Sequence, residues 1–309
     1  MDGKHVYDMI VVGGGPGGYT AALYAARSGL DTLVLEKLSA GGQMALTEAI
    51  DNYPGFEESI DGFTLAEKMQ RQAERFGAKS EYAEVERVDL AASPKVLETS
   101  AGVFYGRTVA LATGAGPREL GLANEAALTG RGVAYCAACD GMRYRGRTVV
   151  VVGGGNSAAG DALALSRVAK KVILVHRRDS LRATKVYHEP LMRAENMEFR
   201  WNSAVTELLG GDRLTGVRLR DLRTGEETQL DCDGVFISVG RKPATELVQG
   251  QLELDRGGYI VADETTKTSL PGVYAVGDVR TKPLRQVVTA VADGAMAVHM
   301  AEEYLAGGE

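Results

Sequence analysis

Short apolar runs, each followed by a glycine-rich turn and a helical pattern, set the framework of this 309-residue chain. The run DMIVV (8–12) leads into GGGPGG (13–18), after which residues 19–28 show apolar positions at helical spacing. A second apolar run, TLVL (32–35), ends at Glu36. This order predicts a strand, a helix and a parallel strand, which is the βαβ unit of dinucleotide-binding folds.

The glycines of the first turn each have a physical reason to be there. Gly13 permits the tight turn, Gly15 lets the backbone approach a pyrophosphate, and Gly18 allows the helix to pack closely on the sheet. The helix N-terminus then offers amides and a positive dipole end to the phosphates. Glu36 is placed to accept hydrogen bonds from a ribose diol. A purely structural glycine turn is the alternative interpretation.

The same pattern occurs a second time. The run TVVVV (148–152) leads into GGGNSA (153–158), a helical segment to about Ala169, and the run VILV (172–175). His176 lies 23 positions after Gly153, as Glu36 lies 23 positions after Gly13. Two βαβ units of equal spacing predict two dinucleotide sites.

The ends of the two units differ in charge. The first ends in an acid, whereas the second ends in HRRDSLR (176–182). Arg177, Arg178 and Arg182 suit a ribose 2′-phosphate, which an acid would repel. The second site is therefore predicted to bind NADPH, unless this cluster is only a solvated basic surface. The first site must then hold the other nucleotide, for which FAD is the natural candidate.

Two later segments support a flavin site and indicate how the chain divides. ALATGA (110–115) and GVYAVGDVR (272–280) are predicted strands that end in small-residue turns, at Thr113-Gly114 and at Gly277-Asp278. Proline and glycine mark boundaries near 116–117 and 241–243. The predicted fold class is α/β, with two Rossmann-like domains, one inserted into the other. The FAD domain comprises 1–116 and 243–309 and ends in a helix over 287–305; the NADPH domain comprises 117–242.

Composition excludes some classes of protein. The net charge is −6, so a nucleic-acid partner is not expected, and an acidic partner would need a local basic patch. No apolar run approaches the length of a membrane span and no signal peptide is recognisable, which predicts a cytoplasmic protein without a membrane partner. In that compartment a cysteine pair is catalytic or metal-binding more often than structural.

Two of the three cysteines lie in the sequence CAACD, as Cys136 and Cys139, followed by Asp140. A C-x-x-C pair serves redox chemistry or half of a zinc site. Zinc needs two further ligands, but Cys232 is solitary and the four histidines form no ligand pair near it. We therefore predict a redox pair and no metal. Asp140 is suited to general acid work, unless it is only a turn or cap residue.

These segments together resemble the low-molecular-weight bacterial thioredoxin reductases. The resemblance extends over nearly the whole chain and is carried by GGGPGG, EK…GGQM (36–44), DNYPGF (51–56), ATG (112–114), CAACDG, GGGNSA, HRRDSLR and GDVRTKPLRQVVTA (277–290). It implies a homodimer in which each subunit holds one non-covalent FAD. Electrons pass from NADPH through the flavin to a Cys136–Cys139 disulfide, which reduces thioredoxin or a thioredoxin-like protein. During this cycle the two domains rotate about the two segments that connect them, near 114–118 and 240–245.

The resemblance also implies roles for individual residues. Cys139 faces the flavin, which leaves Cys136 as the thiolate that attacks the substrate disulfide. The adjacent Asp140, suited to general acid work if burial raises its pKa, would then supply the proton. The residues implied for FAD are Gly13, Gly15, Pro16, Gly17, Gly18, Glu36, Lys37, Gly42, Gln43, Asn52, Thr113, Gly114, Gly277, Asp278, Arg285, Gln286 and Val287. Those implied for NADPH are Gly153, Gly155, Asn156, Ser157, Ala158, His176, Arg177, Arg178 and Arg182.

The sequence departs from this family at two positions. Gly160 stands where relatives carry an acid, within a helix that the glycine weakens by about 1 kcal/mol, and Ala138 stands where threonine is common. The alternatives to consider are an FAD-dependent dithiol oxidase, a ferredoxin-dependent flavin thioredoxin reductase, and a flavoprotein oxidase or ferredoxin reductase without a disulfide. The arginine cluster disfavours the first, the intact NADPH motifs disfavour the second, and CAACD disfavours the third.

Overall fold

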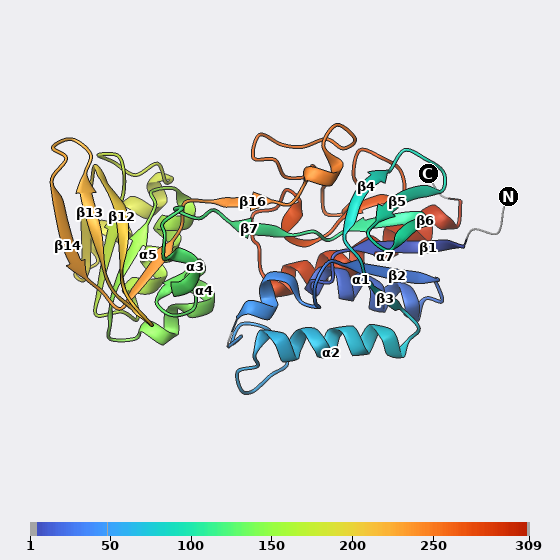
Figure 1. Cartoon of the computed structure of the whole chain (residues 1–309), viewed down its shortest axis with the longest axis horizontal. Coiled ribbons are helices and arrows are strands. Elements are labelled where there is room, and N and C mark those ends of the chain that lie inside the picture. Colours follow the sequence, from blue (N-terminus) through green and yellow to red (C-terminus); the bar gives the residue numbers. More distant parts are fainter. Residues whose placement is uncertain (1–4, 48, 308–309) are drawn as a thin grey trace. The chain divides into compact units, whose positions relative to one another are not determined.

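A computed structural model describes residues 5–47 and 49–307 of the chain. The chain divides into two compact units (Figure 1). The outer unit combines the residues up to Gly116 with those from Lys242 onward, and the inserted unit comprises Pro117–Arg241. The chain returns from the inserted unit to the outer unit between Arg241 and Lys242, one residue before the boundary expected at 242–243. The α/β class with parallel-sheet, Rossmann-like units is as predicted.

The outer unit is built on a mainly parallel sheet. Its strand order is β3-β2-β1-β6-β5-β4, with β17 also paired to β6. Strands β3, β2, β1, β6 and β17 run parallel, whereas β4 and β5 form antiparallel pairs. The strands are β1 (Val6–Val12), β2 (Thr32–Glu36), β3 (Lys79–Tyr82), β4 (Val85–Asp89), β5 (Lys95–Thr99), β6 (Gly102–Leu111) and β17 (Val273–Ala275).

Alternating side chains of this sheet enter two cores. Met9 and Val11 pack against helices α1, α2 and α7, while Ile10 and Val12 pack on the opposite face with residues such as Leu97. The helices are α1 (Pro16–Arg27), α2 (Gly62–Arg75) and α7 (Val287–Leu305), and the short 3₁₀ helices are η1 (Gly42–Leu46), η4 (Glu246–Val248) and η5 (Gly277–Val279). Both faces of the sheet are therefore covered.

Helix α1 begins earlier than predicted, and helix α7 is as predicted. The sequence indicated a helix over 19–28, but α1 starts at Pro16, so Gly17 and Gly18 lie in its first turn. Proline suits this position because the first turn needs no backbone N–H. The helix ends at Arg27 with Ser28 as its C-cap, and Gly29 at φ 79° follows, in agreement with the expected glycine stop.

The inserted unit has a parallel sheet between one layer of helices and a second sheet. The strand order is β11-β10-β9-β15-β8, and the covering antiparallel sheet has the order β12-β13-β14. Val149 and Val151 pack on the helical side, while Val150 and Val152 pack against the antiparallel sheet. The parallel strands are β8 (Val133–Ala134), β9 (Thr148–Val152), β10 (Lys171–Val175), β11 (Met197–Arg200) and β15 (Gly234–Ile237); the antiparallel ones are β12 (Ser203–Gly210), β13 (Leu214–Asp221) and β14 (Glu227–Asp231).

Helix α5 (Asn156–Ser166) ends three residues before the predicted end at Ala169. The side chain of Asn196 donates to the carbonyls of Ser166 and Ala169, both at 2.9 Å, and so satisfies acceptors that a longer helix would use. The other helical segments are α3 (Glu125–Leu128), α4 (Ala137–Asp140), α6 (His188–Arg193), η2 (Gly141–Tyr144) and η3 (Lys185–Tyr187).

Two short strands, β7 (Ala115–Pro117) and β16 (Arg241–Pro243), carry the chain between the units and pair as a two-stranded sheet. Among the described residues, no helix combines the length and apolarity that crossing a bilayer requires.

Candidate active site

The redox candidate is a disulfide at the start of a one-turn helix. Cys136 and Cys139 are bonded, with Cα atoms 5.3 Å apart, and both are half-buried. Cys136 is the N-cap of α4, and its Sγ accepts from the Cys139 amide at 3.2 Å. A hydrogen bond from this amide favours negative charge on the Cys136 sulfur, which is what a thiolate nucleophile requires. The predicted pairing is therefore present.

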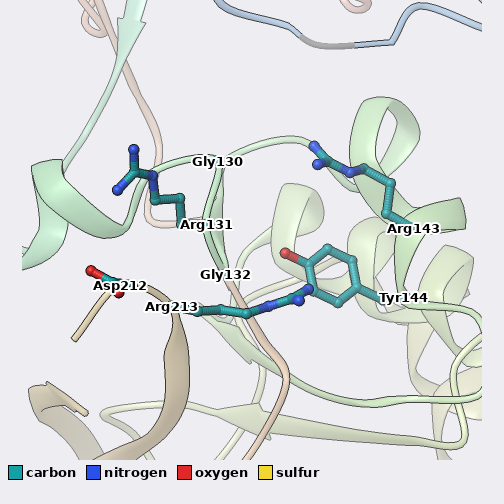
Figure 2. Close-up of a pocket in the computed structure, with 7 residues that line it drawn as sticks. All are labelled: Gly130, Arg131, Gly132, Arg143, Tyr144, Asp212 and Arg213. Atoms are coloured by element: carbon teal, nitrogen blue, oxygen red, sulfur yellow. The ribbon is translucent and has the colours of Figure 1, made fainter. Parts of the chain in front are cut away.

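Asp140 lies at the end of α4, next to a basic hollow. Its carboxylate is 3.8 Å from the guanidinium of Arg143, and its amide donates to the Cys136 carbonyl. Arg143 also lines a cavity of about 240 Å³ with Arg131, Arg213 and Asp212 (Figure 2). Three arginines against two carboxylates, those of Asp212 and Asp140, leave this surface with a net positive charge. The proton-donor role of Asp140 stays a prediction.

A second carboxyl group near the disulfide was missed from sequence. Asp161, on α5, accepts from the Ser238 hydroxyl at 2.5 Å, and the backbone amide of Ala137, between the cysteines, also faces it. Burial raises the pKa of Asp161, and these two donors oppose that rise. Ser238 lies 77 positions away along the sequence, so spacing gave no signal.

Glu125 was also missed, and it fixes the residue that precedes Cys136. Glu125 is 2% exposed and accepts from the amides of Leu120, Gly121 and Leu122. It also accepts the Tyr135 hydroxyl at 2.8 Å. Burial, followed by Glu125 itself, raises the pKa of Tyr135, so this hydroxyl stays protonated. Glu125 thus joins residues 120–122 to Tyr135, directly before the disulfide.

The first glycine turn has the tight packing that its motif predicts. A Cβ on Gly13 would lie 2.5 Å from the Ala112 carbonyl oxygen, and one on Gly18 would lie 1.9 Å from that of Gly13. A Cβ on Gly15 would meet no atom of the described chain within 4 Å. Glu36 accepts from the Gly14 amide at 2.5 Å, which places its carboxylate at the turn.

Several other flavin candidates gather around this turn. Gly42 lies beside Gly15, because a Cβ on Gly42 would be 3.9 Å from the Gly15 Cα. Asn52 donates to Gln286 Oε1 at 3.0 Å, which joins residues 234 positions apart. Gly17 packs against Val276 and Ala290, where η5 and α7 meet. Gly42, Val276 and Ala290 therefore lie beside the glycine turn, and Asn52 is joined to this group through Gln286, at the start of α7.

Several of the remaining flavin candidates have partners within the outer unit. Thr113 Oγ1 donates to the Ala244 carbonyl at 2.7 Å, and Arg285 donates to the carbonyls of Asp278 and Arg280. Gln286 is the N-cap of α7, directly before Val287, and its capping box with Thr289 is formed. Lys37 pairs with Glu84 at 2.6 Å instead of pointing to the turn. The structure adds no support for Lys37, and its assignment stays a prediction.

The second glycine turn has a histidine ring over it. His176 is 4% exposed, and its ring atoms would lie 2.3–2.4 Å from a Cβ on Gly154. Burial, followed by Arg182, Arg178 and Arg177, lowers the pKa of His176, so the ring is neutral. The Arg182 amide donates to the Gly154 carbonyl at 2.7 Å, which folds HRRDSLR back over the turn. All three arginine side chains are exposed.

Both turns fit a dinucleotide. A Cβ on Gly15 or on Gly155 would enter open space within the described structure, as close approach of a pyrophosphate requires. Each turn opens a helix of at least eleven residues, α1 or α5, whose N-terminal amides suit phosphate.

The described residues contain no group of three or more His, Cys, Asp or Glu side chains able to hold a metal. Cys232 is buried, and burial raises its thiol pKa to about 12.

Comparison with known proteins gives consistent matches over the whole length. Residues 7–294 match the pyridine nucleotide-disulphide oxidoreductase family. The chain is 47% identical to the thioredoxin reductase of Streptomyces clavuligerus, over 97% of this chain and 94% of that protein. It is 43% identical to that of Treponema pallidum, over 97% of each. The crystal structure of thioredoxin reductase from Streptococcus pyogenes MGAS5005 superposes with a TM-score of 0.89, at 42% identity, covering 98% of this chain and 99% of that one.

Proposed function

Because this chain belongs to the pyridine nucleotide-disulphide oxidoreductases, and within them to the thioredoxin reductases, we propose that it passes electrons from NADPH through FAD to thioredoxin. The observation that carries the proposal is the Cys136–Cys139 disulfide in a chain with two glycine turns of different charge. A turn with an acid and a turn with arginines suit two different nucleotides, and the disulfide accepts the electrons.

The outer unit is proposed to hold one non-covalent FAD per subunit, and the inserted unit NADPH. Support for FAD comes from the convergence of Glu36, Gly42, Asn52 and Gln286 around the first turn. Support for NADPH comes from the exposed arginines that follow His176. When bound, the flavin would supply a two-electron carrier between the nicotinamide and the disulfide.

The two cysteines then reduce the thioredoxin disulfide by thiol–disulfide exchange. The Cys136 thiolate attacks one sulfur of the thioredoxin disulfide, forming a mixed disulfide and releasing a thioredoxin thiolate, which takes a proton. Cys139 attacks the Cys136 sulfur of that mixed disulfide, which re-forms Cys136–Cys139 and releases the second thioredoxin thiolate. Asp140 is the proposed proton partner for the leaving thiolates. Two electrons thus leave the enzyme and reduce one thioredoxin disulfide.

Access of a protein partner is supported by the basic hollow, whose Arg143 pairs with Asp140, the residue after Cys139. The chain carries a net charge of −6, so an acidic partner needs a local positive surface, and Arg131, Arg143 and Arg213 provide one. The homodimer and the cytoplasmic location stay predictions from sequence.

Rotation of the two units about β7 and β16 is part of the proposal. The disulfide belongs to the inserted unit and the flavin candidates belong to the outer unit. The disulfide must reach the flavin in one step and a protein in another, and NADPH must reach the flavin between them. A crosslink between the units should permit one half-reaction, so full turnover by the crosslinked enzyme would contradict rotation.

The dithiol oxidase and the ferredoxin-dependent reductase are not favoured. Each would share a flavin and a C-x-x-C pair, but neither needs the arginines of HRRDSLR. The similar proteins described above are named thioredoxin reductases.

A pair of single-cysteine variants tests the proposed exchange. C139S keeps Cys136 as the attacking thiol and lacks the resolving thiol, so incubation with thioredoxin should accumulate a covalent mixed disulfide at Cys136. C136S is the matched control and should accumulate none, while its flavin is still reduced by NADPH. Equal trapping by both variants, or trapping by neither, would contradict the assignment.

A further inference from the structure

Three charged side chains lie buried together beneath the proposed flavin site. Arg280, Lys282 and Asp293 have side chains that are 7%, 6% and 13% exposed. Asp293 Oδ2 is 2.6 Å from Lys282 Nζ, and its Oδ1 is 3.4 Å from Arg280 Nη1. Buried charges are uncommon, since each must be paired and hydrogen-bonded to offset lost hydration.

The cluster holds the Gly277–Asp278 turn against the first half of α7. Asp293 Oδ2 accepts the Gly277 amide at 2.9 Å. Lys282 Nζ also donates to the Thr289 carbonyl, at 3.1 Å, in the first turn of that helix. Arg280 donates to the Asp263 backbone carbonyl. One carboxylate therefore joins the turn, the segment after it and the helix.

The cluster is also unbalanced in charge. Two cations share one buried carboxylate, so the three side chains carry a net charge of +1. Arg280 Nε is buried and has no hydrogen-bond partner among the described residues. The carboxylate of Asp263 is exposed and is already bonded to the amide and hydroxyl of Thr265, so water screens it. Positive charge thus remains in the low-dielectric interior next to the N-terminus of α7.

We propose that Arg280, Lys282 and Asp293 are positioning residues for the flavin: they fix the Gly277–Asp278 turn, and their net positive charge favours electron uptake by the bound FAD. The inference rests on the FAD site of the proposed function. Reduction adds negative charge to a flavin, so a nearby cation raises its midpoint potential. The Asp293 hydrogen bond to the Gly277 amide acts on the affinity for FAD. The net charge of the cluster acts on the midpoint potential of the flavin.

Three variants separate these two effects. D293A removes the acceptor for Gly277, whereas D293N keeps an acceptor and removes the charge. K282M keeps the side-chain length and brings the cluster charge to zero. E303Q, at an exposed position of the same helix, is the control. Potentials are measured in a C136S/C139S background, in which the flavin is the only electron acceptor, and affinities are measured by FAD titration of flavin-stripped protein.

The variants are expected to change FAD affinity in one order and the flavin midpoint potential in another. FAD affinity falls about tenfold or more in D293A, less in D293N, and not in E303Q. The flavin midpoint potential rises in D293N, falls in K282M and is unchanged in E303Q. Potentials that do not follow the cluster charge, or D293A affinity equal to that of the wild type, would overturn the proposal. If the aspartate variants do not fold, an unchanged potential in K282M overturns it.

Failure of this inference is distinguishable from failure of the proposed function. A wild-type chain that binds no FAD would overturn both. A chain that binds FAD and reduces thioredoxin, but whose variants show no ordered potentials, would overturn only the cluster's role.

Discussion

The two βαβ units, β1-α1-β2 and β9-α5-β10, have the same order of elements and differ in the residue after the second strand and in the glycine turn. In the first, the Glu36 carboxylate accepts from the Gly14 amide. In the second, a buried neutral His176 lies over Gly154, and three exposed arginines follow it. The two units therefore share a backbone scaffold, and we expect the residue after the second strand and the loop behind it to select the nucleotide.

The second difference is the third small residue of each turn, which is Gly18 in the outer unit and Ala158 in the inserted unit. Ala158 is fully buried and tolerates its methyl group. Gly18 has no such space, because its Cβ would lie 1.9 Å from a carbonyl oxygen. The outer turn is therefore the tighter one.

The largest effect should follow from adding a methyl group to the tighter turn. G18A should destabilise the outer unit by about 1–3 kcal/mol or more, because the Gly13 carbonyl has to move. It should also reduce the FAD content of the purified protein. The matched change in the other unit, A158G, should cost about 1 kcal/mol. Thermal unfolding with flavin quantification checks both, and a fully flavinated G18A of wild-type stability would show that the turns are equivalent.

A smaller effect is expected from removing the charge that distinguishes the second unit. Replacing Arg177, Arg178 and Arg182 by glutamine should raise KM for NADPH about ten- to hundredfold, since hydrogen bonds to a charged phosphate are lost. KM for NADH should change little. R167Q, an exposed arginine on the same unit, is the control. Steady-state kinetics with both nucleotides decides, and an equal rise for NADH would mean that the cluster does not recognise the 2′-phosphate.

His176 should give the stability of the inserted unit a pH dependence. Its pKa is lowered in the fold, so between that value and its usual value near 6.5 the unfolded chain binds a proton that the native state does not. The free energy of unfolding therefore falls as pH falls through this window. H176N should lose less stability than the wild type between pH 7.5 and 5.5, as denaturant unfolding would show. H299N, at an exposed position, is the control and should follow the wild-type curve of stability against pH. A curve for H176N that runs parallel to the wild-type curve would contradict this role of His176.

The smallest effect concerns Gly160, which lies inside α5 and has no counterpart in α1. A Cβ there would meet only Tyr187, at 3.9 Å, which is an ordinary contact. G160A should therefore stabilise the inserted unit by up to about 1 kcal/mol. A higher Tm with unchanged KM for NADPH is expected, whereas a lower Tm would show that the glycine serves a purpose other than helix softening.

What could be predicted from sequence depended on how local the signal was. Helix α7 agreed from Val287 to Leu305 because its long apolar pattern is local. Helix α5 was overestimated because its end is fixed by Asn196, thirty positions beyond Ser166. The glycine turns were recognisable for the same reason as α7.

The support around the sites could not be predicted, because it comes from residues distant in sequence. Asp161 meets Ser238, and Asn52 meets Gln286, only after the sheets have formed. The buried Arg280–Asp293 pair looks in the sequence like ordinary surface charge. Spacing identifies what binds a nucleotide, but not what holds the binding residues in place.

The most direct test of the account is to count the electrons that each subunit accepts from NADPH without oxygen. We expect two electrons for the flavin and two for the disulfide, with Cys136 and Cys139 then open to alkylation and the buried Cys232 still protected. The C136S/C139S variant should accept only the two electrons of the flavin. Bleaching of the flavin in the wild type while Cys136 and Cys139 remain bonded would contradict the central claim.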